Sequence, residues 1–183
     1  MKTDSHPAAL YTLRKVTRIL AIIILLLVAV GFLLPSDYRV ERNIMIEAPR
    51  DLISDNLLRG DYLPEWMYIK NGTVLPFEGV LKEGDSAVLS YNAVNVHGFI
   101  SVVELSSNVI RFDVQPKPKV DIVHNLIALQ STDSGTLVAW TIEGNLSAGL
   151  LSPYLAFFAN DIAGANFEKS LQQLKDKIEV LVQ

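Results

Sequence analysis

The stretch "RILAIIILLLVAVGFLLPSDYRVERNIMIEAP", residues 18–49, changes character twice. It begins with an uninterrupted apolar run, becomes charged after Pro35-Ser36, and then alternates apolar and polar side chains up to Ala48-Pro49. A long apolar run is typical of a membrane-spanning helix, and alternation with a period of two is typical of a β-strand. The sequence therefore predicts a membrane anchor that ends near residue 36 and a folded domain that begins directly after it.

The apolar run is long enough to cross a bilayer. Ile19 to Leu34 is 16 consecutive apolar residues, or about 24 Å of helix at ~1.5 Å per residue. With a snorkelling Arg18, residues 16–36 give a span of 21 positions, which suits a hydrocarbon core roughly 30 Å thick. A cleaved signal peptide needs a small-x-small site in a polar segment, but Ala29-Val30-Gly31 is followed by more apolar residues. We therefore predict a retained anchor over 16–36, preceded by a tail over 1–15.

Basic residues on the two sides of the span predict its orientation. Arg14, Lys15 and Arg18 precede it closely, whereas only Arg39 and Arg42 follow it closely. The flank richer in Lys and Arg normally stays in the cytoplasm. The pattern predicts a single-pass inner-membrane protein with a cytoplasmic N-terminus and an extracytoplasmic, periplasmic domain.

Charge and composition limit what the domain over 37–183 can do. The first 18 residues carry a net charge of +3 and residues 19–36 carry none, so a total of −4 leaves −7 for the domain. Such a domain lacks the basic surface that binds nucleic acid. The chain has no cysteine, which excludes disulfides, thiol nucleophiles and cysteine metal sites. It also lacks HExxH, Walker and GxGxxG motifs, so we expect no metal and no cofactor.

Periodicity predicts an α+β domain. After the strand that ends at Ala48, a short helix is expected from Pro49 to about Leu58. Helical apolar stripes then mark the C-terminal region from Leu151 to Leu181, with a bend expected at Gly164. Between them lie short alternating segments separated by turn residues. These predict strands at roughly 68–77, 86–92, 97–105, 109–115, 122–131 and 136–144.

This order of elements resembles the START-like superfamily, also called SRPBCC or helix-grip, which includes the polyketide cyclase/dehydrase group. The resemblance covers about residues 38–182. It rests on five segments: "VERNIMIEAPRDLI" at 40–53, "LPEWMYI" at 63–69, "FDVQP" at 112–116, "GTLVAWTIEGN" at 135–145 and "DIAGANFEKSLQQLK" at 161–175. It implies a curved antiparallel sheet of about seven strands that wraps a long C-terminal helix and leaves an apolar cavity between them. The superfamily contains lipid carriers, hormone sensors and cyclases, so the resemblance implies no single chemistry.

Large side chains are expected around the space between helix and sheet. An aromatic residue there is more often core than ligand wall, but in a cavity-bearing fold one residue serves both roles. The residues predicted to line the cavity are Trp66, Phe112, Trp140, Tyr154, Phe158 and Ile162.

Two arrangements were considered for catalysis. Hairpin pairing places Asp113, His124 and Glu143 in one row across three strands, a pattern that suits general acid–base chemistry. The row shares its face with other polar side chains, so we favour a solvent-exposed charge ladder. The same pairing places Glu104 on the apolar side, where burial would raise the pKa of its carboxyl and make it a cavity acid, unless a β-bulge reverses it. A glutamate at the rim or in solvent is the interpretation that we favour for Glu104.

These observations leave three functions. The leading one is a membrane-tethered, extracytoplasmic module that binds a hydrophobic small molecule or a lipid, without catalysis. The alternatives are a cyclase/hydrolase-type enzyme that uses a cavity acid, and an interaction module whose cavity is filled by its own side chains. An apolar pocket above roughly 300 Å³ would favour binding; convergent buried titratable groups would favour the enzyme, and a filled pocket the interaction module. No motif specifies a protein partner.

Overall fold

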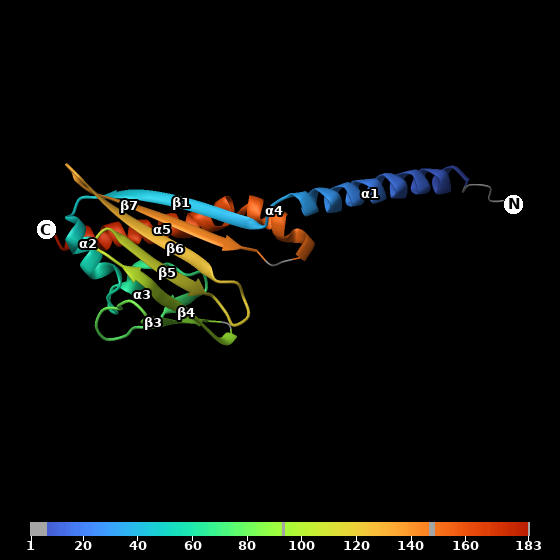
Figure 1. The fold of residues 1–183 in the computed structure, drawn as a ribbon. Coiled ribbons are helices and arrows are strands. Elements are labelled where there is room, and N and C mark those ends of the chain that lie inside the picture. Colours follow the sequence, from blue (N-terminus) through green and yellow to red (C-terminus); the bar gives the residue numbers. More distant parts are fainter. Residues whose placement is uncertain (1–6, 93, 147–148, 183) are drawn as a thin grey trace.

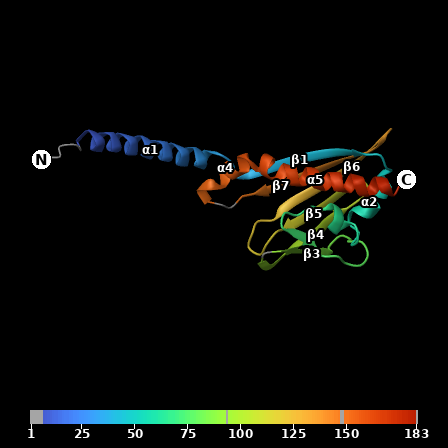
Figure 2. The ribbon, with the colours of Figure 1, turned by 180° about the vertical axis from the view of Figure 1, so that it is seen from behind.

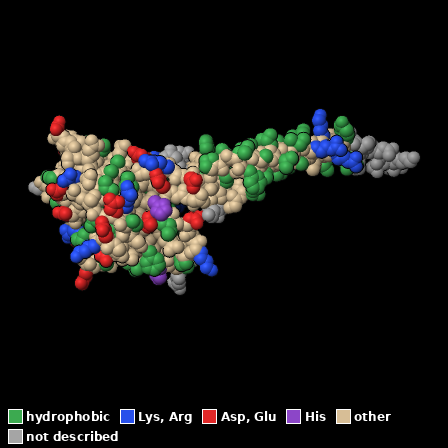
Figure 3. Space-filling view, viewed as in Figure 1, with side chains coloured by type: hydrophobic (Ala, Val, Ile, Leu, Met, Phe, Trp, Pro, Cys, Tyr) green, Lys and Arg blue, Asp and Glu red, His purple; other side chains and the backbone are tan. Residues whose placement is uncertain are grey.

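The computed structural model describes residues 7–92, 94–146 and 149–182; the side chains of residues 7–9, 94, 95 and 159–162 lie outside the described set. A long helix, α1 (Pro7–Leu33), extends away from an α+β domain (Figure 1). Among the described helices, α1 alone is long and apolar enough to cross a membrane, over the 24 residues Leu10–Leu33. Apolar side chains cover α1, and basic side chains gather near the end remote from the domain (Figure 3). Part of the predicted tail over 1–15 is therefore a continuation of this helix.

The domain is built on one seven-stranded antiparallel sheet with the strand order β1-β7-β6-β5-β4-β3-β2. β1 pairs with β7 along its whole length, from Asp37 opposite Asn145 to Ile46 opposite Thr136, so the strand that follows the anchor lies at one edge of the sheet. Each of the six predicted later strands overlaps an observed one. The strands are β1 (Asp37–Ile46), β2 (Gly72–Val74), β3 (Ser86–Tyr91), β4 (Val94–Leu105), β5 (Val109–Gln115), β6 (Val123–Thr132) and β7 (Gly135–Asn145).

The C-terminal helix covers the inner face of this curled sheet. In Figure 2, α5 (Ala159–Val180) lies in front of the strands and runs along them. Its buried face consists of Leu171, Leu174 and Ile178, which pack against inward side chains of the strands such as Phe112 and Trp140. Two short helices, α2 (Arg50–Leu57) and α3 (Leu63–Trp66), complete the core. The predicted class is confirmed: an α+β domain with a seven-stranded curled antiparallel sheet, a C-terminal helix and an N-terminal apolar helix.

The predicted bend at Gly164 is wrong, because the helix breaks earlier. A short 3-10 turn, η1 (Gly149–Leu151), leads into α4 (Ser152–Phe157), and Phe158 separates α4 from α5 with φ −90° and ψ 2°. Gly164 lies inside α5, where a Cβ would overlap the Arg42 guanidinium. Arg42 crosses the helix at this point and its Nε lies 2.6 Å from Oε1 of Glu168. The glycine therefore serves a close approach between β1 and α5 instead of a bend.

Candidate functional site

A small apolar pocket lies between the inner face of the sheet and the first half of α5. Its volume is about 220 Å³, and its walls come from β1, β3, β5, β6, β7, the segment 67–70 and α5. Drug-sized ligands usually occupy roughly 300–1,000 Å³, so the pocket is smaller than the one expected for a binding module. It has room for a small molecule or for one part of a larger molecule.

Packed aromatic rings form the floor of the pocket. Trp140 on β7 and Phe167 on α5 both line it, with ring centroids 4.8 Å apart in an edge-to-face arrangement. Beneath Trp140 lie the buried rings of Trp66 and Phe112, whose centroids are 5.7 and 6.2 Å from that of Trp140. Edge-to-face pairs of this kind are favourable beyond the area that they bury. The floor of the pocket is therefore built from aromatic rings that pack against one another.

Asn125 gives this apolar pocket a buried amide. The residue is 5% exposed; its Oδ1 accepts a hydrogen bond of 3.1 Å from Nε1 of Trp140, and its Nδ2 donates one of 2.9 Å to the carbonyl of Val123. An asparagine side chain can make up to four hydrogen bonds. Two of them hold the amide in place, which leaves one N–H and one lone pair with which it could meet a ligand.

Two tyrosines also contribute to the wall. Burial raises the pKa of Tyr91, and burial together with the nearby charge of Asp121 raises the pKa of Tyr38. Both phenols stay protonated at neutral pH and keep an O–H to donate. The described residues that line the pocket include no carboxylate. None of them is therefore a candidate for the carboxylic acid of a cyclase/hydrolase-type enzyme.

The pocket, called the anchor-side pocket below, lies at the end of the domain to which α1 is attached. Tyr38 follows the last residue of α1 by five positions, Tyr91 ends β3, Val123 begins β6, and Pro116 directly follows β5. These strand ends meet at the side of the sheet where α1 joins the domain (Figure 1). Any molecule that enters between them therefore enters from the anchor side.

The six residues predicted to line the cavity lie at different places in the structure. Trp140 lines the pocket, and Trp66 and Phe112 lie directly beneath Trp140. Tyr154 and Phe158 do not line it: Phe158 is 51% exposed, and Tyr154 donates its hydroxyl to the carbonyl of Leu27 on α1. Their placement accompanies the break at Phe158, because α4, which precedes the break, packs beside the end of α1 as well as against the edge strand β1. The side chain of Ile162 lies outside the described residues.

The wall residues that the sequence analysis missed carry a recognisable signal. Asn125 alternates in register with Val123 and Ile127, so its parity already places a polar side chain among inward positions of β6. Phe167 begins the second apolar stripe of the C-terminal helix. Tyr38 has the same parity as inward-facing Val40 on β1.

The row of Asp113, His124 and Glu143 exists and faces outward. Asp113 pairs with His124, and His124 with Glu143, in the predicted register. The Asp113 carboxylate lies 2.7 Å from Nδ1 of His124, and the His124 side chain is 65% exposed. Acidic, basic and histidine side chains gather on this outer face of the sheet (Figure 3). The arrangement agrees with a solvent-exposed charge ladder, and the described residues contain no cluster suited to a metal ion.

Glu104 lies on that outer face as well. The register between β4 and β5 shifts between Val102 and Glu104, which brings Glu104 opposite Arg111. The Arg111 Nε is 3.4 Å from the Glu104 carboxylate, and both side chains are about half exposed. This position agrees with the favoured interpretation of Glu104 as a glutamate at the rim or in solvent. The alternative, a cavity acid on the apolar side, does not hold, because a β-bulge reverses the face of every residue beyond it.

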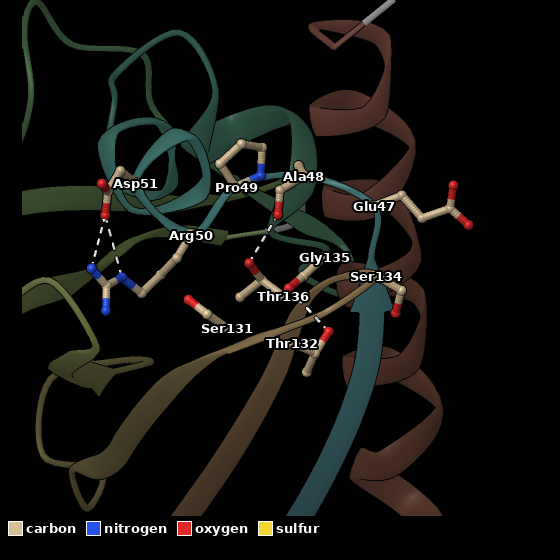
Figure 4. A pocket seen from close by; sticks show the side chains of 10 residues that line it. All are labelled: Glu47, Ala48, Pro49, Arg50, Asp51, Ser131, Thr132, Ser134, Gly135 and Thr136. Atoms are coloured by element: carbon tan, nitrogen blue, oxygen red, sulfur yellow. Dashed lines mark hydrogen bonds and ion pairs between the residues drawn. The ribbon is translucent and has the colours of Figure 1, made fainter.

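A second hollow lies at the opposite end of the sheet. It has a volume of about 450 Å³ and lies between the turn that follows β1 and the β6–β7 hairpin (Figure 4). Its polar groups largely bind one another: Thr136 donates to the carbonyl of Ala48 at 2.9 Å, and Arg50 lies 3.1 Å from Asp51. Because this groove is polar and already paired, it suits an apolar ligand less well than the anchor-side pocket.

Comparisons with known proteins show the fold alone. No family model and no curated protein matches the chain. Among solved structures, protein SA2116 of unknown function from Staphylococcus aureus is similar over 80% of this chain and 96% of its own, with 14% identity and a TM-score of 0.64. Protein CV1439 from Chromobacterium violaceum is similar over 78% of this chain and 98% of its own, with 16% identity and a TM-score of 0.60.

A third similar structure is DynU16, a protein of the dynemicin biosynthetic locus. It matches 77% of this chain with 13% identity and a TM-score of 0.56, and the match covers 47% of DynU16, so this chain spans about half of its length. These likenesses are consistent with the helix-grip resemblance of the sequence. What these structures share with this chain is the curled antiparallel sheet with its C-terminal helix.

Proposed function

We propose that this protein is a membrane-tethered module that binds a hydrophobic small molecule, or the apolar part of a lipid, between the sheet and α5. The observation that carries the proposal is the position of the pocket: an apolar space with a buried amide lies at the end of the domain next to α1. A molecule dissolved in the bilayer then has its shortest path into the domain through this end.

The size and lining of the pocket support one chemical class of ligand. Its volume of about 220 Å³ suits one ring or a short apolar segment, while the rest of a larger molecule stays at the mouth. The free N–H and lone pair of Asn125 suit a carbonyl or hydroxyl group on that segment. The part of the ligand inside the pocket is therefore apolar with one hydrogen-bonding group. Lys70, an exposed residue of the wall, could pair with an anionic group that stays at the mouth.

The experiment uses two alanines on α5 that are two residues apart. Ala163 lines the pocket, whereas Ala165 is exposed, so Ala163→Phe fills the space and Ala165→Phe is its matched control. The full chain is extracted in mild detergent, and native mass spectrometry detects molecules that remain bound. Wild type and Ala165→Phe should retain a bound apolar molecule, and Ala163→Phe should lose it. Equal retention by both variants would contradict the assignment of the pocket.

The extracytoplasmic location is part of the same proposal. It is supported by Arg14, Lys15 and Arg18 before the span. Alkaline phosphatase folds into an active enzyme outside the cytoplasm, so a fusion after Gln183 should be active in bacterial cells. An active cytoplasm-only reporter at the same position would show that the domain lies inside.

One observation favours a second function. The pocket is smaller than a typical ligand site, and the aromatic floor beneath it is close-packed. An interaction module with a mostly filled cavity has these properties. If wild type, Ala163→Phe and Ala165→Phe all lack a bound molecule and fail to bind a fluorescent fatty acid, the interaction module is the better description.

A further inference from the structure

The segment that joins the sheet to α5 exposes an uncharged, apolar surface. Residues 146–160, "LSAGLLSPYLAFFAN", contain no charged side chain. Within η1, α4 and Phe158, which together form the segment 149–158, Leu151 is 64% exposed and Phe157 is 77% exposed. Leu150, Leu155 and Phe158 are exposed as well. A cluster of large apolar side chains in water is unusual and marks a contact surface.

This segment packs against the last third of α1. The Tyr154 hydroxyl donates to the carbonyl of Leu27. Gly31 is buried, and a Cβ at this position would lie 3.4 Å from the Tyr154 ring and 3.5 Å from the carbonyl oxygen of Leu150. Figures 1 and 2 both show α4 beside the end of α1. If α1 spans a membrane, the depth of its last third in the bilayer therefore also determines the depth of the segment 149–158.

The contact lies within the apolar span. Leu27 is seven residues before Leu34, where the apolar run ends, which is about 10 Å along a helix at ~1.5 Å per residue. Helices that lie in a membrane interface bury their apolar face by roughly 5–10 Å. A hydroxyl at this depth also needs a protein partner, because the bilayer core offers none, and Tyr154 has one.

We infer that the segment 149–158 inserts into the leaflet on the domain side, beside α1, as a second membrane contact. The inference deepens the proposed function and rests on its premise that α1 spans the membrane. Lipid acyl chains are the occupant that the structure favours, since the exposed side chains continue the apolar surface of the span itself. Leu151 and Phe157 are the most exposed members of the segment.

The junction between anchor and domain makes this contact a rigid one. The Leu146 N–H donates to the carbonyl of Ser36 at 3.1 Å, and the Asn145 amide donates to Ser36 Oγ at 2.9 Å and to the Asp37 carboxylate at 2.8 Å. With α1 held at the junction and again at Tyr154, the domain cannot rotate freely about its tether. The inserted segment thereby holds the mouth of the pocket, with Tyr38 at its edge, against the bilayer surface.

The chain has no cysteine, so single cysteines can carry an environment-sensitive fluorophore on the full-length protein. Phe157→Cys and Leu151→Cys test the segment, Leu25→Cys reports α1, and Val180→Cys is the exposed apolar control at the far end of α5. The labelled proteins are reconstituted in vesicles of phosphatidylcholine and phosphatidylglycerol. Quenching is measured with lipids that carry a nitroxide near the head or near the middle of the acyl chain.

The segment labels should show blue-shifted emission and stronger quenching by the nitroxide near the head. The label at Leu25 should be quenched more by the nitroxide in mid-chain, and the label at Val180 by neither. Blue-shifted but unquenched segment labels would indicate a protein partner and overturn the inference, as would emission equal to that at Val180. The label at Leu25 separates two causes of such a result. If the label at Leu25 is also unquenched, α1 does not span the membrane, and the proposed tethered function is contradicted together with the inference. If the label at Leu25 is quenched, α1 spans the membrane and only the inference is contradicted.

Discussion

The indole N–H of Trp140 and the side-chain carbonyl of Asn125 form a hydrogen bond of 3.1 Å across neighbouring strands β7 and β6. The two residues are buried, and both line the anchor-side pocket. This bond fixes the orientation of the amide and of the largest ring in the wall. The polar group of the pocket and its aromatic floor are therefore one structural unit.

Asn125→Leu should destabilise the domain by about 1–3 kcal/mol, because it leaves the buried Trp140 N–H without a partner. Trp140→Phe combined with Asn125→Leu should cost less than the sum of the two single changes, since the donor and its acceptor then disappear together. Urea unfolding of the detergent-solubilised chain, followed by circular dichroism, measures both. Asn43→Leu, at an exposed position of β1, is the control. Strict additivity would show that the hydrogen bond contributes nothing.

Phe112→Ala and Phe158→Ala should differ strongly in stability. Phe112 is buried beside Trp140, so its truncation should cost about 3–5 kcal/mol through lost burial and a new void. Phe158 is half exposed beyond the end of α4, so its truncation should cost about 0.5 kcal/mol or less. The same unfolding experiment compares them. A large loss at Phe158 would mean that this side chain packs over the sheet after all, as its helical spacing had predicted.

The sequence analysis located the strands because local patterns determine them. Alternation on β5, β6 and β7 is a property of a few adjacent residues, and hairpin turns of known length then gave the correct pairing of Asp113, His124 and Glu143. The long helix α5 and the long apolar helix α1 are equally local. Each is a continuous pattern that does not depend on any distant partner.

The errors arise where one position or one long-range contact decides the outcome. The bulge after Val102 inserts a single unpaired residue, so the regular pairing that would put Glu104 on the apolar side does not hold, and only the favoured solvent-exposed position remains. The break at Phe158 accompanies a contact between Tyr154 and Leu27, which are 127 residues apart. Apolar spacing cannot distinguish a stripe that packs on the sheet from one that packs on α1, so Tyr154 and Phe158 were placed at the cavity.

Gly164→Ala should not gain the about 1 kcal/mol by which alanine favours a helix over glycine. The added Cβ would overlap the Arg42 guanidinium and displace it from Glu168. The thermal unfolding temperature of the variant should therefore not rise above that of wild type. Ala165→Gly, at the next exposed position of the same helix, changes propensity alone and is the matched control. A stabilised Gly164→Ala protein would show that Arg42 moves aside without cost.

Glu179 should stabilise the folded state at neutral pH and lose this contribution in acid. The hydrogen bond from the Glu47 N–H, at 2.9 Å, lowers the pKa of the Glu179 carboxyl, and Lys175 lowers it further. A carboxyl with a lowered pKa in the folded state stabilises it above the ordinary pKa, and this contribution disappears as the pH falls through the folded value. The Glu179→Gln protein should therefore be less stable than wild type at pH 7. Its free energy of unfolding should also fall less than that of wild type when the pH is lowered to about 3.

Lys175→Gln separates the two causes in the same titration. It removes the ion pair of Lys175 with Glu179 at 3.1 Å but keeps the hydrogen bond from Glu47. Because that hydrogen bond is the larger cause, this variant should keep most of the acid-dependent loss of stability that wild type shows. Urea midpoints measured from pH 7 to about pH 3 give the comparison. A flat profile for Lys175→Gln would assign the pKa shift to the lysine, and the contact between the β1–α2 turn and α5 would then have no part in it.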